Sequence, residues 1–137
     1  MDPDRWRESE TYLYGIDLFN HGFYWEAHEQ WEALWVAAGK KGPVAEFMKG
    51  LIKLAACGIK ARQGRARGIR HHAERAVRHF RKVREHAGSE RFAGLALPVL
   101  EDFAGGIRMR AAEHGAADRM MAERNLLLPE QDAARKT

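Results

Sequence analysis

The stretch FYWEAHEQWEALWV, residues 23–36, decides the fold of this chain. As a helix with about 100° between successive residues, it gathers its aromatic and titratable side chains on one face about 120° wide. Around that face the order is Trp31, Tyr24, Trp35, His28, Glu32 and Trp25. Because three tryptophans are costly to leave in water, we expect this face to be buried or to line a cleft, with His28 and Glu32 carried inward. The stretch therefore predicts a helix that packs against other helices.

The rest of the chain repeats the helical spacing of apolar residues and lacks the alternation typical of strands. Ser9 is a good N-cap for a helix that ends at Asn20, before Gly22. Further helices are expected over residues 23–38, from Pro43 to Gly64, over residues 66–87, in a short segment capped by Ser89, and from Pro98 onward. Their short connections predict an all-α fold, a single compact bundle of five or six antiparallel helices. We expect one domain over residues 1–137, with its core roughly at residues 9–115 and a tail at residues 125–137.

Composition and charge narrow the class of protein. Cys57 is the only cysteine, which excludes an internal disulfide and fits a reducing compartment. No stretch is apolar enough to cross a membrane, and the charged start MDPDR does not resemble a signal peptide, so we expect a cytoplasmic protein without a membrane partner. Residues 1–39 hold eight acids against two arginines, whereas residues 60–91 hold eleven Lys or Arg against three acids. These segments are either complementary within one fold or leave a basic surface for an anionic partner.

Two blocks of the sequence resemble an uncharacterised bacterial and archaeal family, the domain of unknown function 309. The first block reads FNxGxYWEAHExWExxW from Phe19 to Trp35, and the second reads GLIKLAA at residues 50–56, followed by Gly64 and Gly68. The resemblance covers roughly residues 12–83 and implies a compact all-α bundle with no established activity. Many members of that family carry a histidine near the end of the second block. Because this chain has Ile59 and Lys60 there, the resemblance implies an altered site, with Lys60 as a cationic substitute.

We interpret the helix of residues 23–36 as one wall of a site for a small polar or anionic molecule, with hydrolase-like chemistry as an extension. Aromatic walls with a few converging polar groups are typical of small-molecule sites. The candidate catalytic residues are His28, Glu29 and Glu32, because His28 can act as an acid or a base and a carboxylate among aromatic rings needs a partner. The candidate ligand-binding residues are Tyr24, Trp25, Trp31, Trp35, Lys53 and Lys60.

Two other interpretations of the same helix stay open. In the first, His28 and Glu32 bind a divalent metal ion as a variant of the His-Glu-x-x-His zinc helix, although the sequence shows no obvious third ligand. In the second, the same two residues form a satisfied pair buried in the core, and the tryptophans are structural anchors.

The basic helix of residues 66–87 suggests a function of another class. Its many arginines could neutralise phosphates and so bind nucleic acid. However, no aromatic residue is interleaved for base stacking, and a solvated face explains the charges equally well. His72, His79 and His86 repeat every seven residues along one edge, which is typical of a polar boundary or of a seam in a homo-oligomer.

Overall fold

The computed structural model describes residues 1–122, and the fold is all-α with one very short hairpin. The elements before the hairpin are the 3₁₀ helix η1 (Pro3–Glu8), α1 (Glu10–Asn20), α2 (Tyr24–Ala37), α3 (Gly42–Arg62) and α4 (Ala66–Ala87). The elements from the hairpin onward are β1 (Arg91–Phe92), β2 (Leu95–Ala96), α5 (Leu97–Met109) and α6 (Ala116–Ala122). The predicted all-α class is confirmed, although η1 was not foreseen.

Local sequence signals explain where the helices begin and end. The hydroxyl of Ser9 accepts a hydrogen bond from the backbone N–H of Tyr12 at 3.3 Å and so caps α1. Pro43 occupies the first turn of α3, where its missing N–H costs nothing. Gly88 adopts the left-handed conformation, with φ +61°, that commonly ends a helix, and α4 stops there. The predicted bounds of α4, residues 66–87, are confirmed.

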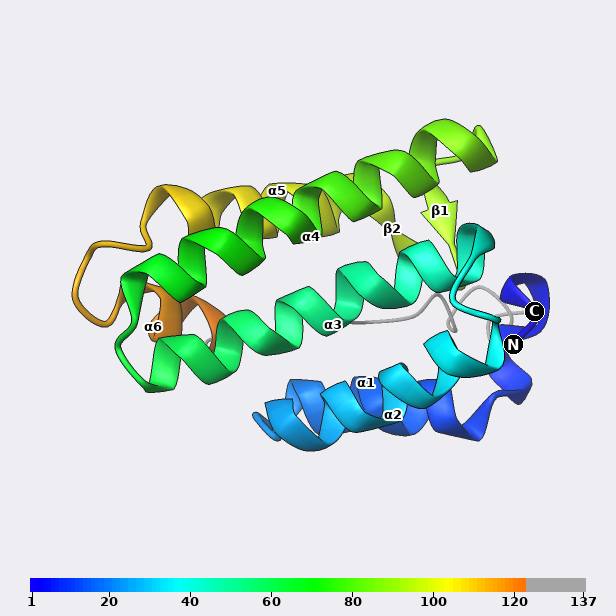
Figure 1. Cartoon of the computed structure of the whole chain (residues 1–137), viewed down its shortest axis with the longest axis horizontal. Helices are drawn as coiled ribbons and strands as arrows, with labels where there is room; N and C mark the ends of the chain where they lie inside the picture. Colours follow the sequence, from blue (N-terminus) through cyan, green and yellow to red (C-terminus); the bar gives the residue numbers. More distant parts are fainter. Residues whose placement is uncertain (123–137) are drawn as a thin grey trace, which may run out of the picture.

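Helices that follow one another in the sequence pack side by side. The packed pairs are α1 with α2, α2 with α3, α3 with α4, and α4 with α5. In Figure 1, α3 lies between α4 and the α1–α2 pair, and α5 lies behind α4. The buried apolar residues between these helices form one cluster, whose largest fully buried members are Trp31, Tyr12, Phe47, Phe80 and Met48. The uncovered side of α3 is therefore bordered by α2 on one flank and α4 on the other.

Close packing of α3 against both neighbours depends on two glycines. A Cβ atom placed at Gly58 would lie less than 3.0 Å from the ring of Tyr24 on α2. A Cβ atom placed at Gly50 would meet the ring of Phe80 on α4 equally closely. Real Cβ atoms do not approach other atoms so closely, so these seams can form only where a side chain is missing.

The segment after α4 differs from the prediction, because Ser89 does not cap a helix. Its hydroxyl instead accepts a hydrogen bond from the backbone N–H of Arg91 at 3.1 Å, and residues 91–96 form an antiparallel hairpin. The hydroxyl of Tyr12 donates a buried hydrogen bond of 2.7 Å to the carbonyl oxygen of Ala93 at the hairpin turn. A tertiary contact with α1 thus holds this turn, and local periodicity cannot reveal such a contact.

The tail predicted at residues 125–137 lies outside the described residues. Among the helices that are described, none is long and apolar enough to cross a membrane.

Candidate functional site on the α2, α3 and α4 face

The four aromatic candidates on α2 divide between the core and the surface. Trp31 is fully buried and Tyr24 is 3% exposed, whereas Trp35 is half-buried and Trp25 is 59% exposed. The structure therefore differs from the expectation that the whole face is buried or lines a cleft. The reason is that the buried arc of the helix runs from Tyr24 through Trp31 to Ala27, and Trp25 lies outside it. Tyr24 and Trp31 therefore pack in the core, whereas Trp25 is exposed on the surface.

His28 and Glu32 lie at the rim of the packed face. Nε2 of His28 is 3.6 Å from Oε2 of Glu32, and the two side chains are 24% and 52% exposed. The ring of Trp25 stacks on the imidazole, with centroids 5.5 Å apart. Nδ1 of His28 is buried and has no hydrogen-bond partner among residues 1–122. The pair is therefore not the sealed, satisfied pair of the structural interpretation. Glu29 is exposed beside it.

A single strip of α3 stays partly exposed between α2 and α4. From residue 45 to residue 60, the partly exposed residues of α3 are Glu46, Lys49, Lys53, Ala56, Ile59 and Lys60. Their spacing places them on one side of the helix. Both lysines predicted for ligand binding, Lys53 and Lys60, belong to this strip.

Two contacts fix the antiparallel register of α2 against α3. Tyr24, at the start of α2, packs on Gly58. At the other end of α2, Nζ of Lys49 lies 4.5 Å from the ring centroid of Trp35. Along α3, Lys53 lies between Lys49 and Gly58. Along α2, the His28–Glu32 pair lies between Trp35 and Tyr24, which contact those two residues. Lys53 therefore lies at the level of that pair.

The basic cluster, as we name it, consists of Lys49, Lys53 and Lys60 of α3 with His72 and Arg75 of α4. Burial lowers the pKa of Lys53, and the positive charges of Lys49 and Arg75 lower it further. Burial is also the first cause that lowers the pKa of His72 to about 4, followed by the charge of Lys53. Nδ1 of His72 is buried, and within the described part of the chain it has no hydrogen-bond partner. Within residues 1–122, no Asp or Glu is among the groups that shift the pKa of Lys53 or the pKa of His72. The charges that lower the pKa of Lys53 are therefore all positive.

The geometry gives a metal ion little to bind. Within residues 1–122, no group of three or more His, Cys, Asp or Glu side chains is arranged to hold one. His28 and Glu32 supply two donors, and a catalytic zinc needs three protein ligands.

In the described part of the chain, the charged side chains of α4 form ion pairs with α3 and α5, and not with the acidic residues 1–39. Arg84 donates two hydrogen bonds, of 2.7 and 3.0 Å, to the carboxylate of Glu101 on α5. Arg108 of α5 donates to Glu74 of α4 at 3.0 Å. No ion pair that the described residues show joins residues 1–39 to residues 60–91. The first interpretation of the uneven charge, two complementary segments, is therefore not supported by direct pairing.

Sequence reasoning missed the contribution of α4 to the candidate site. His72 and Arg75 lie beside Lys53, yet the sequence indicated His72 only as part of a seven-residue repeat. The available signal was the turn at Gly64 between α3 and α4. In an antiparallel pair joined there, Lys53 and Arg75 are equally far from the turn and so face each other.

The similarity to known proteins lies in the part of the chain that holds most of the candidate site. A family model described as domain of unknown function DUF309 matches residues 12–72. This stretch contains most of α1, all of α2 and α3, and the start of α4, and so includes the His28–Glu32 pair and most of the basic cluster. No curated protein and no solved structure matches the chain. Over residues 12–72, the chain is therefore similar to the family described as domain of unknown function DUF309.

Proposed function

We propose that the face shared by α2, α3 and α4 binds a small polar molecule that carries an anionic group. The observation behind this proposal is the basic cluster, in which the partly buried Lys53 lies near other cations and near the imidazole of His72. No carboxylate of the described residues is among the groups that shift the pKa of Lys53 or of His72. Holding like charges together with partial burial costs free energy. An anionic group bound at Lys53 would remove that cost, so the face should favour anionic ligands.

The α2 side of the face would recognise the remainder of the molecule. The exposed ring of Trp25 provides a flat apolar surface, and the half-exposed Glu32 can accept hydrogen bonds. An apolar surface with a few polar groups is typical of small-molecule sites. His28, whose Nε2 faces the carboxylate of Glu32 at 3.6 Å, is the candidate acid or base for hydrolase-type chemistry on a bound substrate.

Thermal unfolding in the presence of polar metabolites with phosphate or carboxylate groups tests the proposal. A ligand at 100 times its Kd raises the free energy of unfolding by about 2.7 kcal/mol. We expect at least one compound to stabilise the wild type and the Arg67→Gln variant, which removes a charge from the exposed start of α4. Lys53→Gln should abolish the effect of that compound. Because burial and then the neighbouring positive charges disfavour a charged Lys53, as its lowered pKa shows, this variant should fold at least as stably without ligand.

Two results would contradict binding at the basic cluster. If no compound stabilises the wild type, or if Lys53→Gln responds to the compound as the wild type does, the basic cluster does not bind the ligand. A ligand whose effect is unchanged in Lys53→Gln but lost in Glu32→Gln would confine the site to α2.

The proposal includes a cytoplasmic location. Cys57 is a free, buried cysteine, and burial raises the pKa of its thiol to about 12. A chain with one unpaired cysteine suits a reducing compartment. Cell fractionation would check the location, and recovery in an exported fraction would contradict it.

A further inference from the structure

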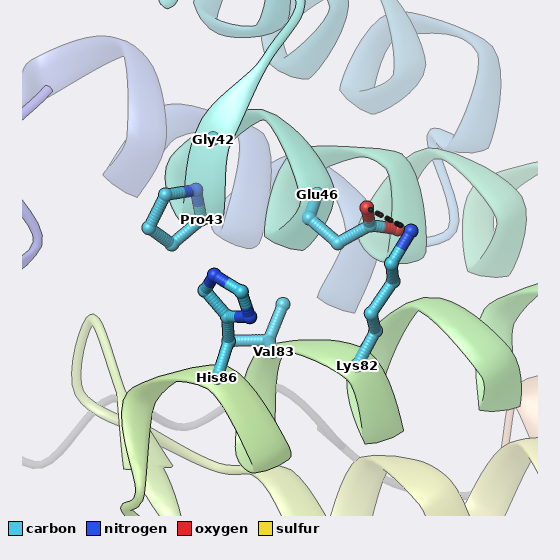
Figure 2. Close-up of a pocket in the computed structure, with 6 residues that line it drawn as sticks. All are labelled: Gly42, Pro43, Glu46, Lys82, Val83 and His86. Carbon is cyan, nitrogen blue, oxygen red and sulfur yellow. Dashed lines mark ion pairs between the residues drawn. The ribbon is translucent and has the colours of Figure 1, made fainter.

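A second group of titratable side chains lies in the groove between α3 and α4, nearer the start of α3 than Lys53. One carboxylate oxygen of Glu46 is hydrogen-bonded to Nδ1 of His79, and the other lies 3.6 Å from Nζ of Lys82. Figure 2 shows the side chain of Glu46 on α3 and that of Lys82 on α4 meeting across the groove. Glu46 and His79 are only 24% and 23% exposed. The negative charge of Glu46 is thus already engaged by two partners.

The second imidazole nitrogen of His79 is not used by this pair. The hydrogen bond described for His79 involves Nδ1 alone. A carboxylate bonded to Nδ1 fixes the orientation of the ring, and in the protonated imidazole Nε2 carries a proton that it can donate. The Glu46–His79 pair therefore holds Nε2 of His79 in a fixed direction, and the carboxylate of Glu46 occupies only Nδ1.

Glu46 and His79 line a cavity of about 110 Å³ together with Arg75, Arg78 and Lys82. A water molecule occupies roughly 30 Å³ of liquid, whereas sites for drug-sized ligands start at roughly 300 Å³. The cavity is therefore large enough for a small ion and too small for a drug-sized ligand. Its lining carries three permanent positive charges against one carboxylate, so a positive excess faces the space.

The arginines have donors to spare for an oxyanion. Arg75 donates from Nε to Nε2 of His71 at 2.9 Å, which leaves the two terminal nitrogens of its guanidinium group. Arg78 is exposed and makes no hydrogen bond within residues 1–122. The hydrogen bond from Arg108 is the main cause that lowers the pKa of Glu74, and the charge of Arg78 contributes to it without using the donors of Arg78. Planar guanidinium groups match the oxygen atoms of phosphate in pairs.

We propose that this cavity binds a small tetrahedral oxyanion of the phosphate class, held by Arg75, Arg78 and Lys82 with Nε2 of His79 as a further donor. The site goes beyond the proposed function, because it requires neither Lys53 nor any residue of α2. Arg75 borders both regions, so Arg78 is the residue that separates them.

A neighbouring cavity provides an internal control. It has a volume of about 210 Å³, shares Glu46 and Lys82 with the first, and extends to Gly42, Pro43, Val83 and His86. In Figure 2 the ring of His86 lies opposite Pro43, on the far side of Val83 from Lys82. A variant at His86 therefore alters the neighbouring cavity without touching the lining of the proposed one.

Titration of ¹⁵N-labelled full-length protein with inorganic phosphate, followed by NMR, tests the site. We expect phosphate to shift the imidazole resonances of His79, which a His79→Gln variant identifies. Arg78→Gln should weaken phosphate binding about tenfold, since charge-assisted hydrogen bonds to guanidinium are lost. Arg67→Gln removes the same charge from the same helix and should leave the Kd within about twofold, because exposed charges so far from the cavity are screened by salt. His86→Gln should also leave the Kd within about twofold, because His86 lines only the neighbouring cavity.

Either of two results would overturn the proposal: no shift of His79 resonances at millimolar phosphate, or equal weakening in Arg78→Gln and Arg67→Gln. Lys53→Gln separates this outcome from that of the proposed function. That variant should lose metabolite binding at the basic cluster while His79 still responds to phosphate.

Discussion

Replacing Gly58 by alanine tests the packing that positions α2 beside the basic cluster. The new Cβ would lie less than 3.0 Å from three atoms of the Tyr24 ring. That ring is 3% exposed and has little room to retreat. It packs edge-on against Phe19 at a centroid distance of 5.3 Å, and the guanidinium carbon of Arg62 lies 4.6 Å from its centroid. Gly58→Ala must therefore displace the ring or separate α2 from α3.

The expected cost follows from two opposing effects. Overpacking of a close seam costs roughly 1–3 kcal/mol, whereas alanine in a helix interior returns roughly 0.5–1 kcal/mol relative to glycine. We expect the free energy of unfolding to fall by about 1–2 kcal/mol. For a domain between 100 and 150 residues, that loss lowers Tm by roughly 3–10 °C.

Urea denaturation followed by tryptophan fluorescence and circular dichroism measures the effect. Gly105→Ala in α5 is the matched control, because a Cβ there would meet no atom within 4 Å. That variant should keep or gain stability, by up to about 1 kcal/mol. If Gly58→Ala proves as stable as Gly105→Ala, the close approach of α2 to α3 is refuted, and with it the register that puts Lys53 at the level of the His28–Glu32 pair.

Four further outcomes are expected. Tyr12→Phe should cost about 1 kcal/mol by removing the hydrogen bond to Ala93, and an unchanged midpoint in urea would argue against that bond. Glu32→Gln should change stability by less than about 1 kcal/mol, since its pair with a histidine is half-exposed; a much larger loss would contradict this small contribution of the pair to stability. The pKa of His72, about 4 when folded against the usual 6.5, means that the unfolded chain binds the extra proton. Stability should therefore fall as pH drops from 6.5 towards 4, and denaturation at a series of pH values should show a smaller fall for His72→Gln. Cys57, whose pKa burial raises to about 12, should react with an aromatic disulfide reagent at pH 8 only after unfolding, so rapid labelling of native protein would contradict its burial.

The sequence predicts most of this fold because its helices carry strong local signals. Ser9, Pro43 and Gly88 act through their own backbone conformation and side-chain chemistry, so their effects need no knowledge of the neighbours. The hairpin at residues 91–96 is different, because the contact of Tyr12 with Ala93 joins residues 81 positions apart.

The candidate site was predictable only in part. Periodicity placed His28 and Glu32 together on α2, but it could not say which arc of that helix the core would cover, and Trp25 fell outside it. The partnership of Lys53 with His72 depends on the register of α3 against α4. Its consequence, a lowered pKa at both groups, depends on burial that only the packed helices create.

An NMR map of where the strongest stabilising anionic compound binds would show whether the α2, α3 and α4 face is a ligand site. We expect backbone shifts to concentrate around His28, Lys53 and His72, and the pKa of His72 to rise on binding because the ligand supplies a negative charge. A saturable shift pattern that spares Lys53 and leaves the titration of His72 unchanged would show that the anion binds elsewhere.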